Sequence, residues 1–371
     1  ISPSIDADIA QLDKKVNEAF AASYLAPLLP MTRSQNWEIR RGSITSVARL
    51  SDDNLRAAAA ALRNLHGKSI LADVLSFSLS DMCTMPQRRE AVNGFVNLIG
   101  HRYCHGQLLA DNLLPRVLML LRECQQNASM RLVIPQVIAA IETLCNNDEV
   151  APVLLKSGFV SELLTVATDT STGDGLIALS MRRSAVQALV AMSKGQHAKI
   201  ELKNEGAMQL ASDLLESATD EGLRRGGATL ACNLCLHPDN KHDVVASPLF
   251  TQIMLNVQDD TRGAEDEELA LAIAALCSEP SLLADLASVE MKDALLSILL
   301  DGGTMACRHA MWAVSSLMTH RPVEPAFLNP EFLSAVVEHA NDNDDKPTRM
   351  DAMRAVCWLA MDAPTTMPQG S

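Results

Sequence analysis

The sequence predicts an all-α fold built from about eight repeated helical units. Three observations support this expectation: a composition that favours helices, a ten-residue helical pattern that recurs eight times, and similar connecting segments between the recurrences.

The composition favours helices over sheets. Apolar residues make up 48 % of the 371 residues and aromatic residues only 3 %. Leu, Ala and Met are good helix formers, whereas large β-sandwiches and barrels use more aromatic and β-branched residues. The formal net charge of −14 repels phosphate backbones, so we expect nucleic acid to bind only through a local basic stripe. No run of 18 apolar residues predicts a membrane span.

The nine cysteines are odd in number and most lie within apolar helical patterns. Buried, reduced thiols of an intracellular protein account for this better than a disulfide framework. We therefore expect an intracellular, cytoplasmic protein. Because the chain begins with Ile1, a removed N-terminal targeting segment stays compatible with the sequence.

The repeated pattern is a ten-residue window whose third, sixth, seventh and tenth residues are small or apolar, which places them on one helix face. The windows are Arg41–Leu50, Arg89–Leu98, Pro135–Leu144, Arg183–Met192, Arg225–Leu234, Glu267–Leu276, Arg308–Leu317 and Met350–Leu359. Consecutive windows end 46 to 48 residues apart as far as Met192 and 41 or 42 residues apart after it. The sixth residue is small in every window except the fifth, where it is Leu230, and a small residue there allows close helix packing.

The segments between windows also resemble one another. Ala151 to Gly158 is followed by an apolar stretch from Phe159, and Lys199 to Gly206 by one from Ala207. Each glycine suits the left-handed conformation found where helices end. One repeat is therefore expected to contain a short first helix, a turn, a second helix and a long third helix that carries the window.

This pattern resembles the armadillo repeat, whose third helix begins with Arg and ends with Asn-Leu. Leu223–Leu234 and Arg89–Leu98 match that helix well. HEAT repeats are of similar length but have two helices. The resemblance covers about residues 36–362 and implies a right-handed armadillo-type α-solenoid of about eight three-helix repeats. Residues 1–35 would form an N-terminal cap helix region, and residues 363–371 a flexible tail.

The resemblance also implies that the third helices line a concave groove, in which the fifth and ninth window residues contact the ligand. Asn97 and Asn233 match the family's Asn, and Trp312 matches its Trp, but no window has both. Asn93 and Gln187 occupy the fifth position elsewhere. The ladder that holds basic import signals is therefore absent, which argues against a transport adaptor of the usual kind.

The first window position forms a basic stripe of Arg41, Arg89, Arg183, Arg225 and Arg308, often with a second Arg just before it. Arginine suits carboxylates because its fork is bidentate, and catenin-like members bind acidic extended peptides. An equally weighted alternative is that these arginines only bridge acidic loop residues such as Asp220 and Glu221. The full set of candidate partner-binding residues is Arg41, Arg89, Asn93, Asn97, Arg183, Gln187, Arg225, Asn233, Arg308 and Trp312.

Catalytic and metal motifs are weak. Cys232, Cys235, His237 and His242 have a zinc-like spacing, but no second pair follows at a finger-like distance, so core cysteines are the better interpretation. No phosphate-binding loop, nucleophile elbow or His-Glu-x-x-His motif occurs. We therefore expect no cofactor, no metal and no enzymatic activity.

Two functional hypotheses remain. The first is a non-catalytic scaffold whose third-helix groove holds an extended or acidic segment of a protein partner. The alternative is a structural subunit of a larger assembly, such as a ribonucleoprotein, organellar or flagellar complex.

Overall fold

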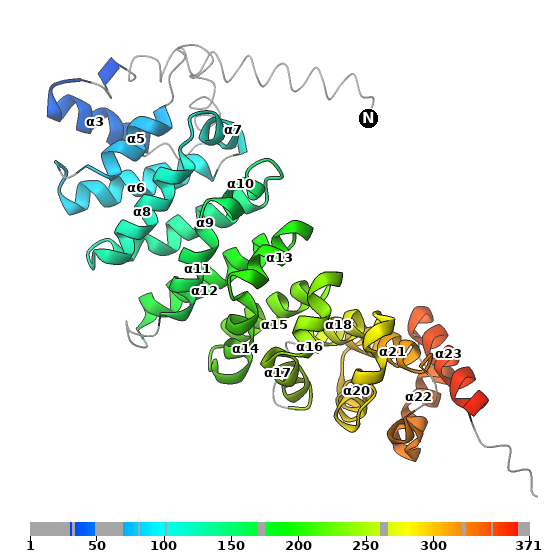
Figure 1. The fold of residues 1–371 in the computed structure, drawn as a ribbon. Helices are drawn as coiled ribbons and strands as arrows, with labels where there is room; N and C mark the ends of the chain where they lie inside the picture. Colours follow the sequence, from blue (N-terminus) through cyan, green and yellow to red (C-terminus); the bar gives the residue numbers. More distant parts are fainter. Residues whose placement is uncertain are drawn as a thin grey trace, which may run out of the picture. The chain divides into compact units, whose positions relative to one another are not determined.

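The computed structural model describes residues 30–31, 34–48, 70–80, 82–100, 102–169, 175–259, 266–320, 324–342 and 344–362. Every regular element within these ranges is a helix, as the composition and the repeats predict. The residues group into two compact units, Ile1–Met192 and Ser193–Ser371 (Figure 1). The boundary coincides with the change in window spacing at Met192. The expected tail and most of the expected cap region lie outside the described residues.

In the first unit, the windows lie on helices that pack in sequence: α3 contacts α6, α6 contacts α9, and α9 contacts α12. The other helices form the first and second helices of each repeat. The elements are α3 (Trp37–Ala48), α5 (Ile70–Ser78), α6 (Met85–Ile99), α7 (Arg102–Ala110), α8 (Leu114–Gln126), η2 (Arg131–Val133), α9 (Ile134–Cys145), α10 (Ala151–Lys156), α11 (Phe159–Thr168) and α12 (Leu176–Met192).

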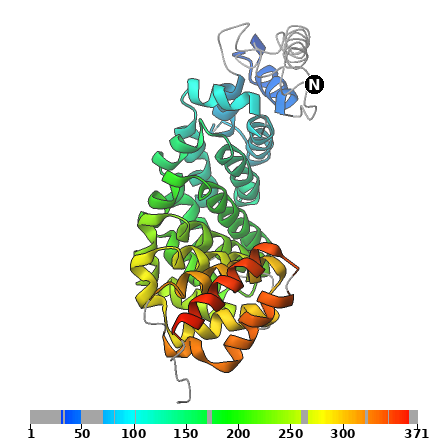
Figure 2. The same cartoon turned by 90° about the vertical axis from the view of Figure 1, so that its right-hand side faces the viewer.

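In the second unit, the window helices α15, α18, α21 and α23 again pack in sequence. The second helices α14, α17, α20 and α22 also contact one another in sequence and form a second layer. Figure 2 shows α22 and α23 (orange to red) side by side. The elements are α13 (Gln196–Asn204), α14 (Ala207–Ser217), α15 (Glu221–Cys235), η3 (Pro238–Asn240), α16 (Lys241–Val245), α17 (Pro248–Val257), α18 (Asp266–Cys277), η4 (Pro280–Leu282), α19 (Leu283–Leu286), α20 (Val289–Asp301), α21 (Thr304–Leu317), η5 (Pro325–Leu328), α22 (Pro330–Asp342) and α23 (Lys346–Asp362).

The predicted windows are helical throughout, apart from residues 49–50, which lie outside the described ranges. Ala185, Ala188 and Leu189 are fully buried, as the window pattern predicts for one helix face. The small sixth residue is also buried in the described windows after the first. Ser46, in the first window, is exposed instead and donates its hydroxyl to the Gly42 carbonyl.

The first helix of the repeat shortens along the second unit. It has nine residues in α13, five in α16 and four in α19, after nine in α7 and six in α10 of the first unit. In the last repeat it is reduced to the 3₁₀ turn η5. The turn between first and second helices uses Gly158 at φ 82° and Gly206 at φ 101°, which confirms the left-handed conformation predicted for both.

The last described repeat has an exposed apolar end. The fourth window residue is buried in the preceding three repeats, where Ala228, Ala270 and Met311 are fully buried. Its counterpart Met353 is 49 % exposed, and Cys357, one turn further along α23, is also exposed. No single helix in the described ranges is long and apolar enough to cross a membrane. The bent pair Glu267–Cys277 and Pro280–Leu286 meets the length and composition criteria only when joined across its 91° bend.

Candidate protein-binding surface

The candidate surface consists of the first, fifth and ninth window residues on the third helices. These positions lie one turn apart on the face opposite the core residues. We call it the third-helix surface and describe it separately for each unit. In the first unit α6, α9 and α12 carry it; in the second unit α15, α18, α21 and α23 do.

Helix α6 presents Arg89, Asn93 and Asn97 along one exposed or half-exposed edge. Its N-terminal half, together with η2 and the start of α9, borders a shallow, open pocket of about 410 Å³. We call this the α6 pocket, and its lining residues are Pro86, Arg89, Glu90, Asn93, Leu132, Val133 and Gln136.

The α6 pocket combines three kinds of group. Arg89 forms no ion pair with any described residue, so its guanidinium is available to a ligand. Asn93 and Gln136 add amide groups that can both donate and accept hydrogen bonds. Leu132 is an exposed apolar side chain on the far wall. This set suits a peptide segment, whose backbone needs both donors and acceptors and whose side chains include carboxylates and apolar groups.

Helix α12 carries Arg183 and Gln187, both exposed and one turn apart. They extend the third-helix surface of the first unit along a second helix. The predicted residue Arg41 lies on α3, but its side chain is outside the part that the structure describes.

In the second unit, two predicted arginines are bound to carboxylates of the following repeat. Arg225 Nε lies 3.6 Å from Glu268 Oε1 in an ion pair whose arginine is exposed and whose glutamate is half-buried. Arg308 binds Asp345 with two nitrogens, and its Nε donates to Oδ2 at 2.9 Å. This guanidinium, assisted by the Thr348 hydroxyl, holds the pKa of Asp345 well below its usual range.

These two pairs bear on the alternative interpretation of the basic stripe. The arginines do bridge acidic residues, but the acids belong to the next repeat rather than to the loop at Asp220. Asp220 instead caps α15, because its carboxylate accepts from the backbone N–H of Leu223 at 3.0 Å.

The remaining two predicted residues differ in exposure. Asn233 is half-buried, and its amide donates to the Ser193 hydroxyl at 2.8 Å. Trp312 on α21 is 39 % exposed, which leaves part of its indole available for contact with a partner.

The sequence pattern did not distinguish the arginines just before the windows from those inside them. Arg88 is buried, and its Nε donates to the Ser78 carbonyl at 2.9 Å while its terminal nitrogen pairs with Glu123. Arg182 Nε donates to the Ala167 carbonyl at 3.1 Å, and Arg224 donates to the Ala218 carbonyl at 3.3 Å. All three therefore satisfy carbonyl groups at the end of the preceding second helix.

Reasoning from the windows also missed Leu132 and Gln136, which form the far side of the α6 pocket. Both lie where η2 meets α9, at the edge of or outside the ten-residue pattern. The signal available in the sequence was an apolar residue, Leu132, just before a window.

The zinc-like cysteines are core residues. Cys232 and Cys235 are buried on α15, and burial raises the pKa of the Cys232 thiol to about 12. Of the nearby histidines, His237 accepts from the Asp239 N–H and His242 lies 3.1 Å from the Ser281 hydroxyl. Within the described ranges, no three or more Cys, His, Asp or Glu side chains form a group that could hold a metal ion.

Comparison with known proteins gives a match in structure alone. No family model matches the sequence, and no curated protein does. A chain from a structure of the phosphorylation-controlled interaction between cadherin and β-catenin matches 94 % of this chain and 66 % of its own length, at 15 % identity and a TM-score of 0.64. Computationally designed armadillo repeat proteins for modular peptide recognition match 66 % of this chain and 99 % of their own, at 14 % identity and a TM-score of 0.57.

The chain has the armadillo-repeat fold. UNC-45 from Drosophila melanogaster supports the same conclusion, with 14 % identity, a TM-score of 0.53 and 92 % of this chain covered. The armadillo-repeat chain spans 47 % of the length of that UNC-45 chain.

Proposed function

We propose that this armadillo-repeat chain is a non-catalytic protein-binding scaffold that holds an extended or acidic segment of a partner on its third-helix surface. The observation that carries the proposal is the α6 pocket, where Arg89 and Asn93 stand beside the exposed Leu132. The solved structures of this fold include proteins designed for peptide recognition and a chain that takes part in the cadherin interaction, which supports the same use.

The acidic preference rests on the first unit. Arg89 has no carboxylate partner among the described residues, whereas Arg225 and Arg308 already bind Glu268 and Asp345. A carboxylate of the partner would therefore pair with Arg89 at little cost. It would have to displace an existing ion pair to reach Arg308.

A charge reversal at Arg89 tests the proposal. The 371-residue chain would be immobilised, and co-purifying proteins would be quantified for the unaltered chain, Arg89→Glu and Lys156→Glu. Lys156 is an exposed lysine on the first helix α10, so the control changes the net charge equally away from the third-helix surface.

We expect Arg89→Glu to reduce its specific partners by about ten-fold or more, because a lost charge-assisted contact costs about 1.5–3 kcal/mol. Lys156→Glu should retain them. Equal retention by both variants would contradict use of this surface. A native mass that then showed a stoichiometric complex would favour a structural subunit instead. A panel of twelve-residue acidic, neutral and basic peptides measures the charge preference separately.

A further inference from the structure

In three repeats of this chain, an arginine directly before the window has the same structural role. Arg88, Arg182 and Arg224 each precede a window directly, and each donates from its guanidinium to a carbonyl at the end of the second helix. Carbonyl groups at a helix C-terminus have no partner within the helix, and the helix dipole makes this end negative. A guanidinium therefore suits the space between second and third helices, because it supplies both hydrogen-bond donors and a positive charge.

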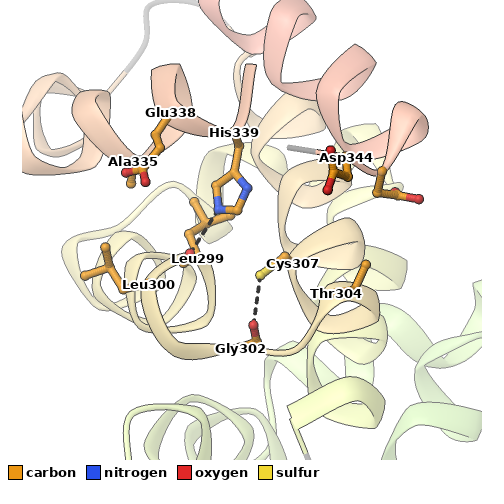
Figure 3. Close-up of a pocket in the computed structure, with 10 residues that line it drawn as sticks. Leu299, Leu300, Gly302, Thr304, Cys307, Ala335, Glu338, His339 and Asp344 are labelled. Carbon is orange, nitrogen blue, oxygen red and sulfur yellow. Dashed lines mark hydrogen bonds between the residues drawn. The ribbon is translucent and has the colours of Figure 1, made fainter. Parts of the chain in front are cut away.

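In the seventh repeat this residue is Cys307. Its sulfur makes the same kind of contact, lying 3.2 Å from the Gly302 carbonyl oxygen and 3.3 Å from that of Ile298. A thiol is a weak donor and is far shorter than an arginine side chain. A cavity of about 490 Å³ lies beside it, between α20, α21 and α22 (Figure 3).

The cavity resembles the space that Arg88 fills in the second repeat. There the guanidinium is held by the Ser78 carbonyl on one side and by Glu123 of the next second helix on the other. Glu123 lies twelve residues before its third-helix window, and Glu338 lies twelve residues before the window at Met350. Glu338 lines the cavity, is exposed, and forms no ion pair with any described residue.

Other groups around the cavity make it suitable for a cation. Asp344 stands at its edge, and Thr304 contributes a hydroxyl (Figure 3). His339 Nε2 lies 2.9 Å from the Leu299 carbonyl oxygen and donates to it, so a ligand would use the other acceptors. The neighbouring Arg308 does not fill the space, because it is bound by two nitrogens to Asp345.

We propose that this cavity, which we call the Cys307 pocket, binds the guanidinium group of an arginine side chain presented by a partner protein. The ligand would stand where Arg88, Arg182 and Arg224 stand in three other repeats, with the Gly302 carbonyl and Glu338 taking the parts of Ser78 and Glu123. A planar fork of donors matches such a divided set of acceptors better than an ammonium point charge does. This site is separate from the α6 pocket and prefers the opposite charge, so it does not depend on the proposed function.

The test measures binding of a blocked peptide, acetyl-Gly-Gly-Arg-Gly-Gly-amide, to the full chain by methyl NMR. The methyl groups of Leu299, Leu300 and Ala335 report the cavity. We expect saturable shifts at these methyls, with affinity at least about ten-fold weaker when citrulline, the neutral isostere, replaces arginine. A lysine peptide should bind more weakly than the arginine peptide. Free L-arginine should bind no more tightly than the blocked peptide.

Two variants locate the site. Cys307→Arg supplies the internal guanidinium, so we expect it to abolish peptide binding without lowering the melting temperature. Glu338→Gln should weaken binding by about five- to ten-fold, whereas Glu331→Gln, an exposed residue at the start of the same helix, should leave it unchanged. If Cys307→Arg does not fold, the comparison of peptide binding by Glu338→Gln and Glu331→Gln tests the site.

Several results would overturn the proposal. They are equal affinity for the citrulline peptide, unchanged binding by Glu338→Gln, or no saturable shift with the arginine peptide at 10 mM, roughly the weakest binding expected of a small ligand. Free arginine that bound ten-fold more tightly than the blocked peptide would overturn the assignment to a protein partner.

Discussion

Replacing Arg88 by Ala should destabilise the first unit far more than replacing its neighbour Arg89. Arg88 is 3 % exposed, donates to the Ser78 carbonyl and pairs with Glu123. Removing one member of a buried pair costs about 3–5 kcal/mol. The Glu123 side chain remains 31 % exposed, so water recovers part of this cost, and we expect a loss of about 3 kcal/mol.

Urea unfolding combined with amide hydrogen exchange measures this loss. Because the chain has two compact units, exchange of the amides in α5, α6 and α8 reports the first unit separately from the second. We expect these amides to exchange about a hundred-fold faster in Arg88→Ala, the factor that corresponds to about 3 kcal/mol. The control Arg89→Ala should stay within about 0.5 kcal/mol of the unaltered protein, as is usual for surface positions.

A double substitution separates the charge from the packing. Arg88→Met combined with Glu123→Leu removes both charges while keeping most of the side-chain volume, and should recover most of the lost stability. If Arg88→Ala and Arg89→Ala destabilised the first unit equally, the structural role given to Arg88 would be refuted.

Three further outcomes are expected. Gly206 has φ 101° and open space around it, so Gly206→Ala should lower the unfolding free energy by about 1–2 kcal/mol through backbone strain. Gly303 has φ −66° and also lies in open space, so Gly303→Ala should cost less than half as much when both variants are unfolded in urea. Cys357 should react with a maleimide at pH 8 long before the other cysteines, because those are buried and burial raises the pKa of Cys124 and Cys145 to about 12; intact-mass spectra showing two thiols labelled at similar rates would contradict the burial. Asp345→Asn should lower the melting temperature at pH 7, because Arg308 depresses the folded-state pKa of Asp345. The difference in melting temperature from the unaltered protein should persist above the unfolded carboxyl pKa of about 4 and shrink as the pH falls below it. A difference independent of pH would refute the ion-pair explanation.

The repeat architecture could be predicted because local periodicity specifies it. Each window repeats the same spacing of small and apolar residues, and the structure buries Ala185, Ala188 and Leu189 on the predicted face. The left-handed conformation of Gly158 and Gly206 could be predicted for the same local reason, because it depends on the residue type at one position. The shortening of the first helix to η5 was not foreseen, because the windows describe third helices only.

The distinction between Arg88 and Arg89 was also present in the periodicity. The residue before a window lies three and four positions from Ala91 and Val92, both buried, so it shares their helix face. Arg89 is one residue further on, about 100° around the helix, and faces the α6 pocket. Sequence reasoning treated the two as one basic stripe and therefore missed that only one of them is exposed to a ligand.

The ion pairs between repeats could not be predicted from local pattern. Arg308 and Asp345 are separated by most of a repeat in sequence, and their contact depends on how α21 and α23 stack. The α6 pocket likewise joins α6 to the junction of η2 and α9. Both features arise from the packing of neighbouring repeats. Composition and spacing predict that neighbouring repeats pack closely, but not which side chains meet.

Site-specific photo-crosslinking tests the central claim most directly. A photo-crosslinking amino acid would replace Asn93 in the α6 pocket or, as a control, Lys156 on α10, and crosslinked proteins would be identified after capture through the full chain. We expect a defined partner to crosslink from position 93, through one contiguous peptide, and not from position 156. Crosslinking of the same partner from position 156 but not from position 93 would contradict binding on the third-helix surface.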